Sequence, residues 1–584
     1  MRSILMAGAI ALLAACAAAK PLAAPDETSP ALVAQTSQAL TTYLDAEYEK
    51  ELQLSPETLT SQGRKVHYDR LDDRSDAGAA RELAWRRRSV AAMRAQFAPA
   101  RLNEEARTSF DVWAQALDTD EKTYQFRRYP YLATEQGGDH TSLPQFLITK
   151  HRVDDTKDMQ AYITRVGLIG VALDQDIANA SASAALGIHM PRFMYAKARA
   201  DATKLISGAP FTDGPDSALF ADGKTKIDAL AAAGKITPAE GVRLKAALAR
   251  AMVERMKPGY DHLIAWLKRD EPNAAPEAHG VGALPNGAAW YNASLSIRTT
   301  TELTADQIYD LGVSEVKRIR GEMETVKARA GFKGSLQDFF VFMRTDKRFY
   351  YPNTDEGREA YLAQARTDLA AMKLRLPEYF GLLPKADLVV KRVEAFREVA
   401  GGAQHYQAGT PDGARPGIFY VHLSDMNAEP NYQLANIAFH EGLPGHHLQI
   451  SIAQERTGLP KFRTHYNYTA YVEGWGLYSE ALAKEMGFES DPYDDFGRLS
   501  GEMWRAIRLV LDTGIHAKGW SEEQAVQYFM DNSAQPEQAI RSEVRRYITN
   551  PGQATCYKIG MITAKLIVPF GAPLHARPGK AFEP

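Results

Sequence analysis

The sequence has little cysteine and no large excess of charge of either sign. Two cysteines among 584 residues are too few for a disulfide framework or a cysteine-rich zinc or iron–sulfur site. Any metal would therefore be bound by histidine, aspartate or glutamate. The 69 basic and 72 acidic side chains give a formal net charge of −3, so the strongly basic field typical of nucleic-acid-binding proteins is missing. We expect no nucleic-acid partner.

Apolar runs long enough to span a membrane are also missing, because a membrane helix needs about 20 apolar residues. The apolar run 4–13 follows a single basic residue and is typical of a secretory signal, which predicts a signal peptide over 1–23. Leu13-Ala14-Ala15-Cys16 resembles a bacterial lipoprotein cleavage box, and this predicts lipidation of Cys16. The alternative is an ordinary signal cut after the alanines at 17–19. We expect a periplasmic protein attached to the outer membrane only through Cys16, or otherwise a secreted one.

The periodicity of a helix dominates the rest of the chain. Apolar residues recur at intervals of three and four, which predicts a mainly α fold with helices near 32–52, 79–97, 238–256, 308–330 and 359–374. Thr304 and Gln307 have the spacing of a capping box before the fourth of these helices, and Thr237 precedes the third in the same way. The clearest strand pattern is Gly417–Leu423. We expect this small β element to lie beside the active-site cleft.

Glycine and proline mark possible boundaries at 208–216, 270–287 and 401–416, but the composition does not change across these segments. We therefore expect residues 24–584 to form a single large helical domain. Pro569, Pro573 and Pro578 are incompatible with a continued helix, so the tail after about residue 567 is expected to be irregular.

Histidine is concentrated in one segment, where six of the fourteen lie between His405 and His465. The centre of this segment is His440-Glu-Gly-Leu-Pro-Gly-His-His447. A His-Glu pair followed by a second histidine one helical turn later directs two imidazoles at one zinc ion, while the glutamate faces the water on the metal. The usual position of the second histidine is occupied here by Pro444, so an unbroken helix could not supply it.

Pro444 and Gly445 predict an irregularity in that helix. Proline removes a backbone donor and clashes with the preceding turn, and glycine tolerates unusual dihedral angles. We expect a bulge of two residues that returns His446 to the place of the second ligand. His447 is the alternative.

A third ligand is expected from the segment Glu473-Gly-Trp-Gly-Leu-Tyr-Ser-Glu480. Two histidines and a carboxylate form the usual set of protein ligands at a catalytic zinc site. Glu473 is the best candidate because Gly474 and Trp475 favour its burial, and a buried carboxylate needs a cation or a metal. Glu480 lies two turns further along the same helix face and is expected to support a ligand instead of binding the metal.

The motifs in this region resemble those of the bacterial family catalogued as domain of unknown function 885, whose members are similar to helical zincin-like metallopeptidases. The resemblance covers roughly residues 40–561, in the expected order, through the segments Thr299–Thr304, Arg415–Tyr420, His440–Gln449, Glu473–Glu480 and Pro551–Gly560. One departure is the tail, which becomes rich in proline and glycine from Pro569 where the family usually continues as a helix.

The resemblance implies that one Zn²⁺ ion is bound by His440, His446 and Glu473, with Glu441 as the catalytic carboxylate. In such a mechanism the glutamate takes a proton from water and passes it to the leaving amine. We expect Tyr557 to stabilise the oxyanion, because it lies in a distinctive motif after Pro551-Gly552. Tyr547, Tyr471 and His422 are alternatives for that role.

The expected function is that of an exported zinc metallopeptidase acting on peptide substrates. The alternatives are a zinc hydrolase of a non-peptide or cell-wall amide, and a binding lipoprotein without catalysis. Cations such as Arg541, Arg545, Arg546 and Lys558 are candidates for contact with a peptide carboxyl terminus. The strand at 418–423 is a candidate for pairing with an extended peptide. The sequence does not predict an oligomeric state.

Overall fold

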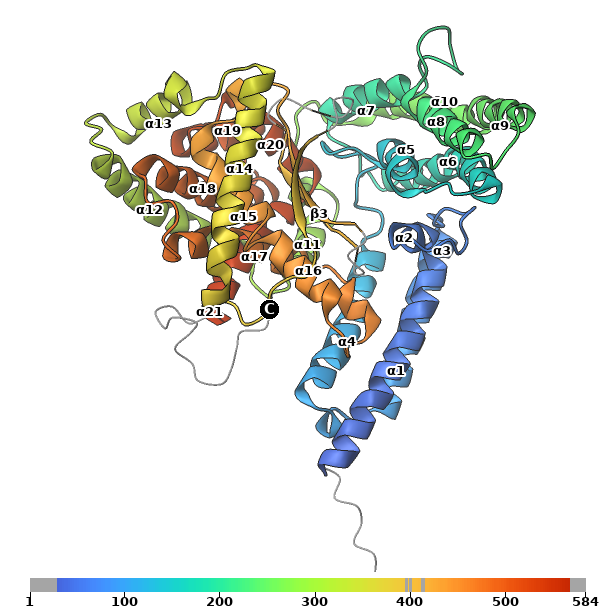
Figure 1. The fold of residues 1–584 in the computed structure, drawn as a ribbon, viewed down its shortest axis with the longest axis horizontal. Helices are drawn as coiled ribbons and strands as arrows, with labels where there is room; N and C mark the ends of the chain where they lie inside the picture. The colour runs from blue at the N-terminus through green and yellow to red at the C-terminus, as the bar shows by residue number, and fades with distance from the viewer. Residues whose placement is uncertain (1–28, 394–397, 399–401, 411–414, 568–584) are drawn as a thin grey trace, which may run out of the picture.

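The computed structural model describes residues 29–393, 398, 402–410 and 415–567, which form a mainly helical protein with one small sheet (Figure 1). The predicted signal segment with Cys16, and the tail after residue 567, lie outside the described residues. Within these ranges no helix has both the length and the apolar character needed to cross a membrane.

The first group of helices forms an extended arm, drawn in blue in Figure 1. It contains α1 (Pro30–Leu54), α2 (Pro56–Ser61), α3 (Asp76–Gln96) and α4 (Glu104–Gln125). Leu44, Val90 and Trp113 lie in the buried cluster of this arm. Phe462, from far along the sequence, joins the same cluster with its ring 5.0 Å from that of Trp113. The arm is thus packed against the short 3₁₀ helix Lys461–Thr464, near the end of the histidine-rich segment.

The second group forms a separate lobe at the upper right of Figure 1. Its helices are α5 (Asp139–Lys150), α6 (Thr156–Ala184), α7 (Arg192–Leu205), α8 (Ala218–Ala232), α9 (Pro238–Ala251) and α10 (Lys257–Asp270). The helix predicted at 238–256 ends at Ala251, and a π-helical turn, Met252–Met256, joins it to α10. Tyr162, Leu248 and Trp266 belong to the hydrophobic core of this lobe.

The third group contains the remaining helices and the sheet. Its helices are α11 (Gly287–Thr299), α12 (Ala305–Arg329), α13 (Leu336–Thr345), α14 (Asp355–Arg375), α15 (Leu434–Glu441), α16 (His446–Glu455), α17 (Thr469–Glu485), α18 (Pro492–Lys518), α19 (Glu522–Asn532), α20 (Glu537–Thr549) and α21 (Cys556–Ile567). Ile319, Met503 and Ile507 lie in the core that α12 and α18 share. The capping box before α12 is confirmed, since Thr304 and Gln307 exchange both hydrogen bonds.

The sheet has three strands, β1 (Leu388–Arg392), β2 (His405–Gln407) and β3 (Gly417–Val421), in the order β1-β3-β2. The predicted strand is confirmed as β3, and all five of its residues are buried. It pairs in parallel with β1 and antiparallel with β2, so both of its edges are occupied. The prediction that an extended peptide pairs with this strand is therefore wrong.

Candidate metal centre

The helix that carries His440 does not bulge, as the sequence suggested, but breaks. α15 ends at Glu441 and α16 begins at His446, with Gly442–Gly445 between them. The Gly445 amide donates to the carbonyl of Phe439 at 3.0 Å, and a Cβ on Gly445 would lie only 1.9 Å from the carbonyl oxygen of His440. The turn is thus too tight for any other residue at this position. It returns the chain so that the rings of His440 and His446 lie 4.7 Å apart.

Three predicted ligands meet at one point. Oε2 of Glu473, on α17, lies 3.6 Å from Nε2 of His440 and 3.6 Å from Nε2 of His446. Ligands on a tetrahedral zinc ion, at bond lengths of about 2.0–2.2 Å, are separated by about 3.3–3.6 Å. Both of the Glu473 distances lie in that range, and two imidazoles with a carboxylate are a donor set that suits zinc.

Glu441, the last residue of α15, belongs to the same cluster. Donor atoms of His440, Glu441 and His446 all lie within 4.8 Å of one another, and all three residues are buried. Glu441 therefore lies beside the two imidazoles, where its carboxylate would face any group that the histidines hold.

Glu480 fixes the orientation of His440. Its Oε1 lies 2.7 Å from His440 Nδ1, and its Oε2 accepts a hydrogen bond from Asn436 at 2.8 Å. A carboxylate bonded to one ring nitrogen leaves the other, Nε2, directed at the metal position. Burial lowers the pKa of His440, but the contacts of its ring with Glu473 and Glu480 raise it to about 10. Zinc would therefore displace a proton when it binds.

Three residues of the Glu473-Gly-Trp-Gly476 run, Glu473, Trp475 and Gly476, lie at the site. Burial raises the pKa of Glu473, but the contacts with His440 and His446 lower it by a larger amount, so that the pKa lies well below its usual value. The indole of Trp475 donates to the carbonyl of Pro444 at 2.9 Å and so fixes the turn between the two histidine helices. A Cβ on Gly476 would lie 2.7 Å from His440 Nε2 and 3.0 Å from His446 Cε1, so glycine leaves the space that the rings occupy.

His447, the alternative ligand, lies toward the sheet. Its Nε2 is 3.1 Å from the carbonyl of Ala386, and its Nδ1 is 3.1 Å from the hydroxyl of Tyr406 and 3.3 Å from that of Ser451. Burial lowers the pKa of His447 to about 4. Since both nitrogens have partners there, His446 is the histidine that the fold brings to His440. His446 Nδ1, by contrast, is buried and has no hydrogen-bond partner among the described residues.

The helices that carry Glu473 and Tyr557 approach each other closely. α17 and α21 meet at Gly474 and Gly560, where a Cβ on Gly474 would lie 2.4 Å from the backbone of Gly560. Tyr557 is one turn before Gly560 on α21. Burial and the negative charge of Glu473 raise the pKa of Tyr557, so its hydroxyl keeps its proton near neutral pH.

The alternatives to Tyr557 are less well placed. Tyr547 is fully buried, and its hydroxyl donates to Glu543 at 2.8 Å. Tyr471 is 51% exposed. The backbone amide of His422 donates to the side chain of Gln404, and the imidazole of His422 lies 5.9 Å from that of His405.

The predicted cations differ in their surroundings. Arg541 and Arg545 pair with carboxylates near the surface of α19 and α20, and Lys558 is buried against Glu502 at 2.6 Å. Arg546 forms an ion pair with Glu543 at 3.2 Å. Sequence reasoning missed Arg505 and Arg508, whose guanidinium groups lie 5.8 Å and 4.7 Å from the centre of the Tyr557 ring. Their spacing of three on an amphipathic helix was the only available signal.

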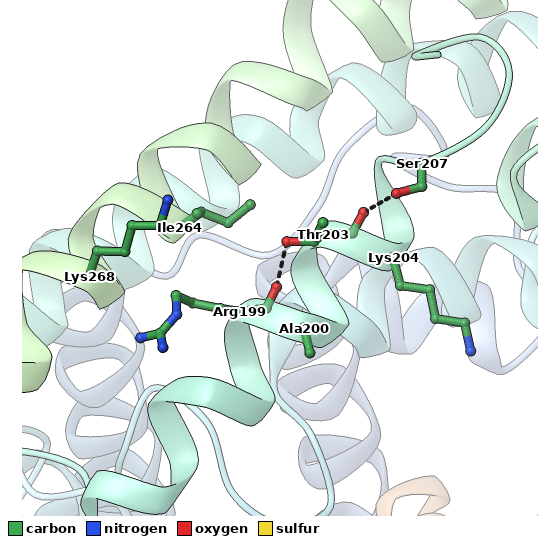
Figure 2. A pocket seen from close by; sticks show the side chains of 7 residues that line it. All are labelled: Arg199, Ala200, Thr203, Lys204, Ser207, Ile264 and Lys268. Carbon is green, nitrogen blue, oxygen red and sulfur yellow. Dashed lines mark hydrogen bonds between the residues drawn. The ribbon is translucent and has the colours of Figure 1, made fainter. Parts of the chain in front are cut away.

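A hollow between α7 and α10 has none of these features (Figure 2). Lys204 points away from Arg199 and Lys268, and the hydroxyls of Thr203 and Ser207 donate to backbone carbonyls of α7. Without converging polar groups, this hollow has no chemistry comparable to that of the histidine cluster.

A family model described as bacterial protein of unknown function, DUF885, matches residues 56–567. The chain belongs to this family. Solved structures share the fold over most of the chain. A Colwellia psychrerythraea protein described as a lipoprotein has a TM-score of 0.82 and 25% identity, over 91% of this chain and 92% of its own.

A second similar structure comes from Shewanella oneidensis and is described as a lipoprotein of unknown function. Its TM-score is 0.66 at 18% identity, over 92% of this chain and 94% of its own, which shows a likeness of fold. No protein of curated function matches the chain.

Proposed function

We propose that this DUF885 protein is an exported, zinc-dependent metallopeptidase of the zincin-like type. The observation that carries the proposal is the position of one Glu473 oxygen at 3.6 Å from Nε2 of both His440 and His446. Two imidazoles and a carboxylate are the protein ligands of catalytic zinc in many hydrolases, with one further position left for water. The Glu473 side chain is 23% exposed, so solvent reaches the site.

Zinc bound at such a site acts as a Lewis acid and lowers the pKa of water there to about 7. Glu441 accepts a proton from the attacking water, whose oxygen forms a new C–O bond, and delivers this proton to the leaving amine nitrogen. The C–N bond then breaks, and the C–O bond remains in the product. The hydroxyl of Tyr557 donates a hydrogen bond to the carbonyl oxygen that becomes negative. The raised pKa of Tyr557 keeps this proton on the hydroxyl. Glu480 holds His440 in the orientation that this chemistry needs.

Export as a lipoprotein is part of the same proposal. The cleavage box ending at Cys16 supports it, as do the descriptions of the Colwellia and Shewanella proteins as lipoproteins. We expect the wild-type protein to incorporate labelled palmitate and to fractionate with membranes, and Cys16→Ser to do neither. Equal labelling of the two forms would contradict lipidation at this residue.

The test of the activity compares wild type with Glu441→Gln. Bound zinc is measured by elemental analysis, and cleavage is followed by mass spectrometry of a peptide library. We expect both proteins to hold one zinc ion per chain and only wild type to cleave. Glu359→Gln, a change at an exposed carboxylate of α14, is the matched control and should cleave normally. Zinc without cleavage in wild type would instead favour a hydrolase of another amide, and no zinc in wild type would refute the proposal.

A further inference from the structure

Three arginines gather around Tyr557. Arg505 and Arg508 lie one turn apart on α18, with their guanidinium carbons 5.8 Å and 4.7 Å from the centre of the Tyr557 ring. Arg546, from α20, interacts electrostatically with both Arg508 and Tyr557. Three positive charges are thus held close together, which is unfavourable unless negative charges lie nearby.

One carboxylate serves two of these arginines. Glu543 pairs with Arg508 at 3.0 Å and with Arg546 at 3.2 Å. Among the described residues, Arg505 makes one long hydrogen bond, to the carbonyl of Gly501 at 3.4 Å. Arg508 is only 5% exposed. Arg505 Nε, Arg508 Nη1 and Arg546 Nε are buried and have no hydrogen-bond partner within the described residues. Buried donors of charged groups left without partners cost free energy that a bound anion would recover.

The arginines lie next to the metal centre. A Cβ on Gly501 would be 3.0 Å from Glu480 Oε2 and 3.6 Å from Arg505 Nη1, so Arg505 is a close neighbour of the carboxylate that orients His440. The centre of the Tyr557 ring lies 4.7 Å from the guanidinium carbon of Arg508, and the charge of Glu473 adds to burial in raising the pKa of Tyr557. Among the described residues, the ion pairs of these arginines are all made with Glu543.

We propose that Arg505 and Arg508 bind the free α-carboxylate of a peptide substrate, which makes this protein an exopeptidase that acts at the carboxyl end of short peptides. The inference rests on the proposed function and specifies its substrate class. The guanidinium fork matches a carboxylate in geometry and pairs with it through two hydrogen bonds. A carboxylate held beside Tyr557 would anchor the carboxyl-terminal end of the substrate, and the chain before it would reach Glu441 with the scissile carbonyl. Water adds across that peptide bond, and the released amine belongs to the anchored fragment.

The binding test uses the Glu441→Gln protein and two probes, N-acetyl-trialanine and its carboxamide, titrated by calorimetry. We expect the free acid to bind at least about 10-fold more tightly than the amide, as the loss of a charged hydrogen bond predicts. Because the arginines and not the metal bind the carboxylate, the preference should persist after zinc is removed with a chelator. Equal affinities for the acid and the amide would overturn the inference.

Substitutions assign the preference to residues. In the Glu441→Gln protein, Arg505→Gln and Arg508→Lys should each abolish most of the preference for the acid. The first change removes a positive charge, and the second keeps the charge but removes the guanidinium group that forms two hydrogen bonds with a carboxylate. Arg541→Gln is the control. Arg541 lies on the surface of α20 and pairs with Glu523 of α19, so this change should leave the preference unchanged. If Arg508→Lys does not fold, the half-buried Arg505 still provides the test. A preference that survives both changes would refute the assignment.

Cleavage separates this inference from the function on which it rests. Wild type should release carboxyl-terminal fragments from a peptide library with free ends and should leave the matching carboxamide library largely intact. Internal cleavage of both libraries would preserve the peptidase and overturn the carboxylate site. Preferential binding of the acid without cleavage of any peptide would preserve the site and refute the peptidase.

Discussion

Replacing Gly476 with alanine places one methyl group against both histidines of the candidate metal centre. The new Cβ would lie 2.7 Å from His440 Nε2 and 3.0 Å from His446 Cε1, whereas carbon contacts are normally about 3.5–4.0 Å. His440 must therefore move by about 0.8 Å or more. Overpacking of this kind costs about 1–3 kcal/mol of stability. Displacing a ligand from its supported position lowers metal affinity by about 10- to 100-fold.

The assay is competition for zinc against a chelator of known affinity, with urea unfolding of the metal-free protein measured in parallel. Gly321→Ala is the matched control, because Gly321 lies within α12 and a Cβ there would meet nothing within 4 Å. That change should leave zinc affinity unaltered and raise stability by about 0.4–1 kcal/mol. If Gly476→Ala binds zinc as tightly as wild type, the two histidines do not hold the metal beside this glycine.

Three further predictions concern the surroundings of the site. Glu480→Gln should weaken zinc binding by about 10- to 100-fold in the same competition assay, and an unchanged affinity would show that the carboxylate does not support His440. Trp475→Phe removes the hydrogen bond to Pro444 and should cost about 1 kcal/mol in urea unfolding; no loss would mean that this bond does not stabilise the turn. Burial raises the pKa of Asp512 to about 7 from 3.8, so the folded protein holds a proton that the unfolded chain releases, and stability falls as pH rises through this window. Relative to Asp512→Asn, wild type should lose about 4 kcal/mol between pH 4 and pH 8, and parallel stability curves would contradict the shift.

The helical fold and its family could be predicted from the sequence because both depend on local patterns. The spacing of apolar residues predicted α1, α3, α12 and α14 to within a few residues of their ends. The short strands β1 and β2 have too few residues to show an alternating pattern. Because the sequence does not reveal β1 and β2, it could not show that β3 is the central strand with a neighbour on each edge.

The residues of the candidate metal centre could be picked out because their residue types carry the chemistry, but the geometry that joins them could not be predicted. Pro444 and Gly445 indicated an irregular helix, and the choice between a bulge and a break depended on a contact with Phe439 that only the folded chain reveals. The arginines near Tyr557 were missed for a related reason. Arginines on a helix are usually solvated, and only the packing of α18 against α20 and α21 buries Arg508.

The zinc content of His446→Ala and His447→Ala tests the central claim most directly. The two residues are neighbours in sequence, and both are buried, yet only His446 faces Glu473 while His447 bonds to Ala386. Elemental analysis should find one zinc ion per chain in wild type and in His447→Ala, and almost none in His446→Ala. Zinc retained by His446→Ala and lost from His447→Ala would contradict the proposed metal centre.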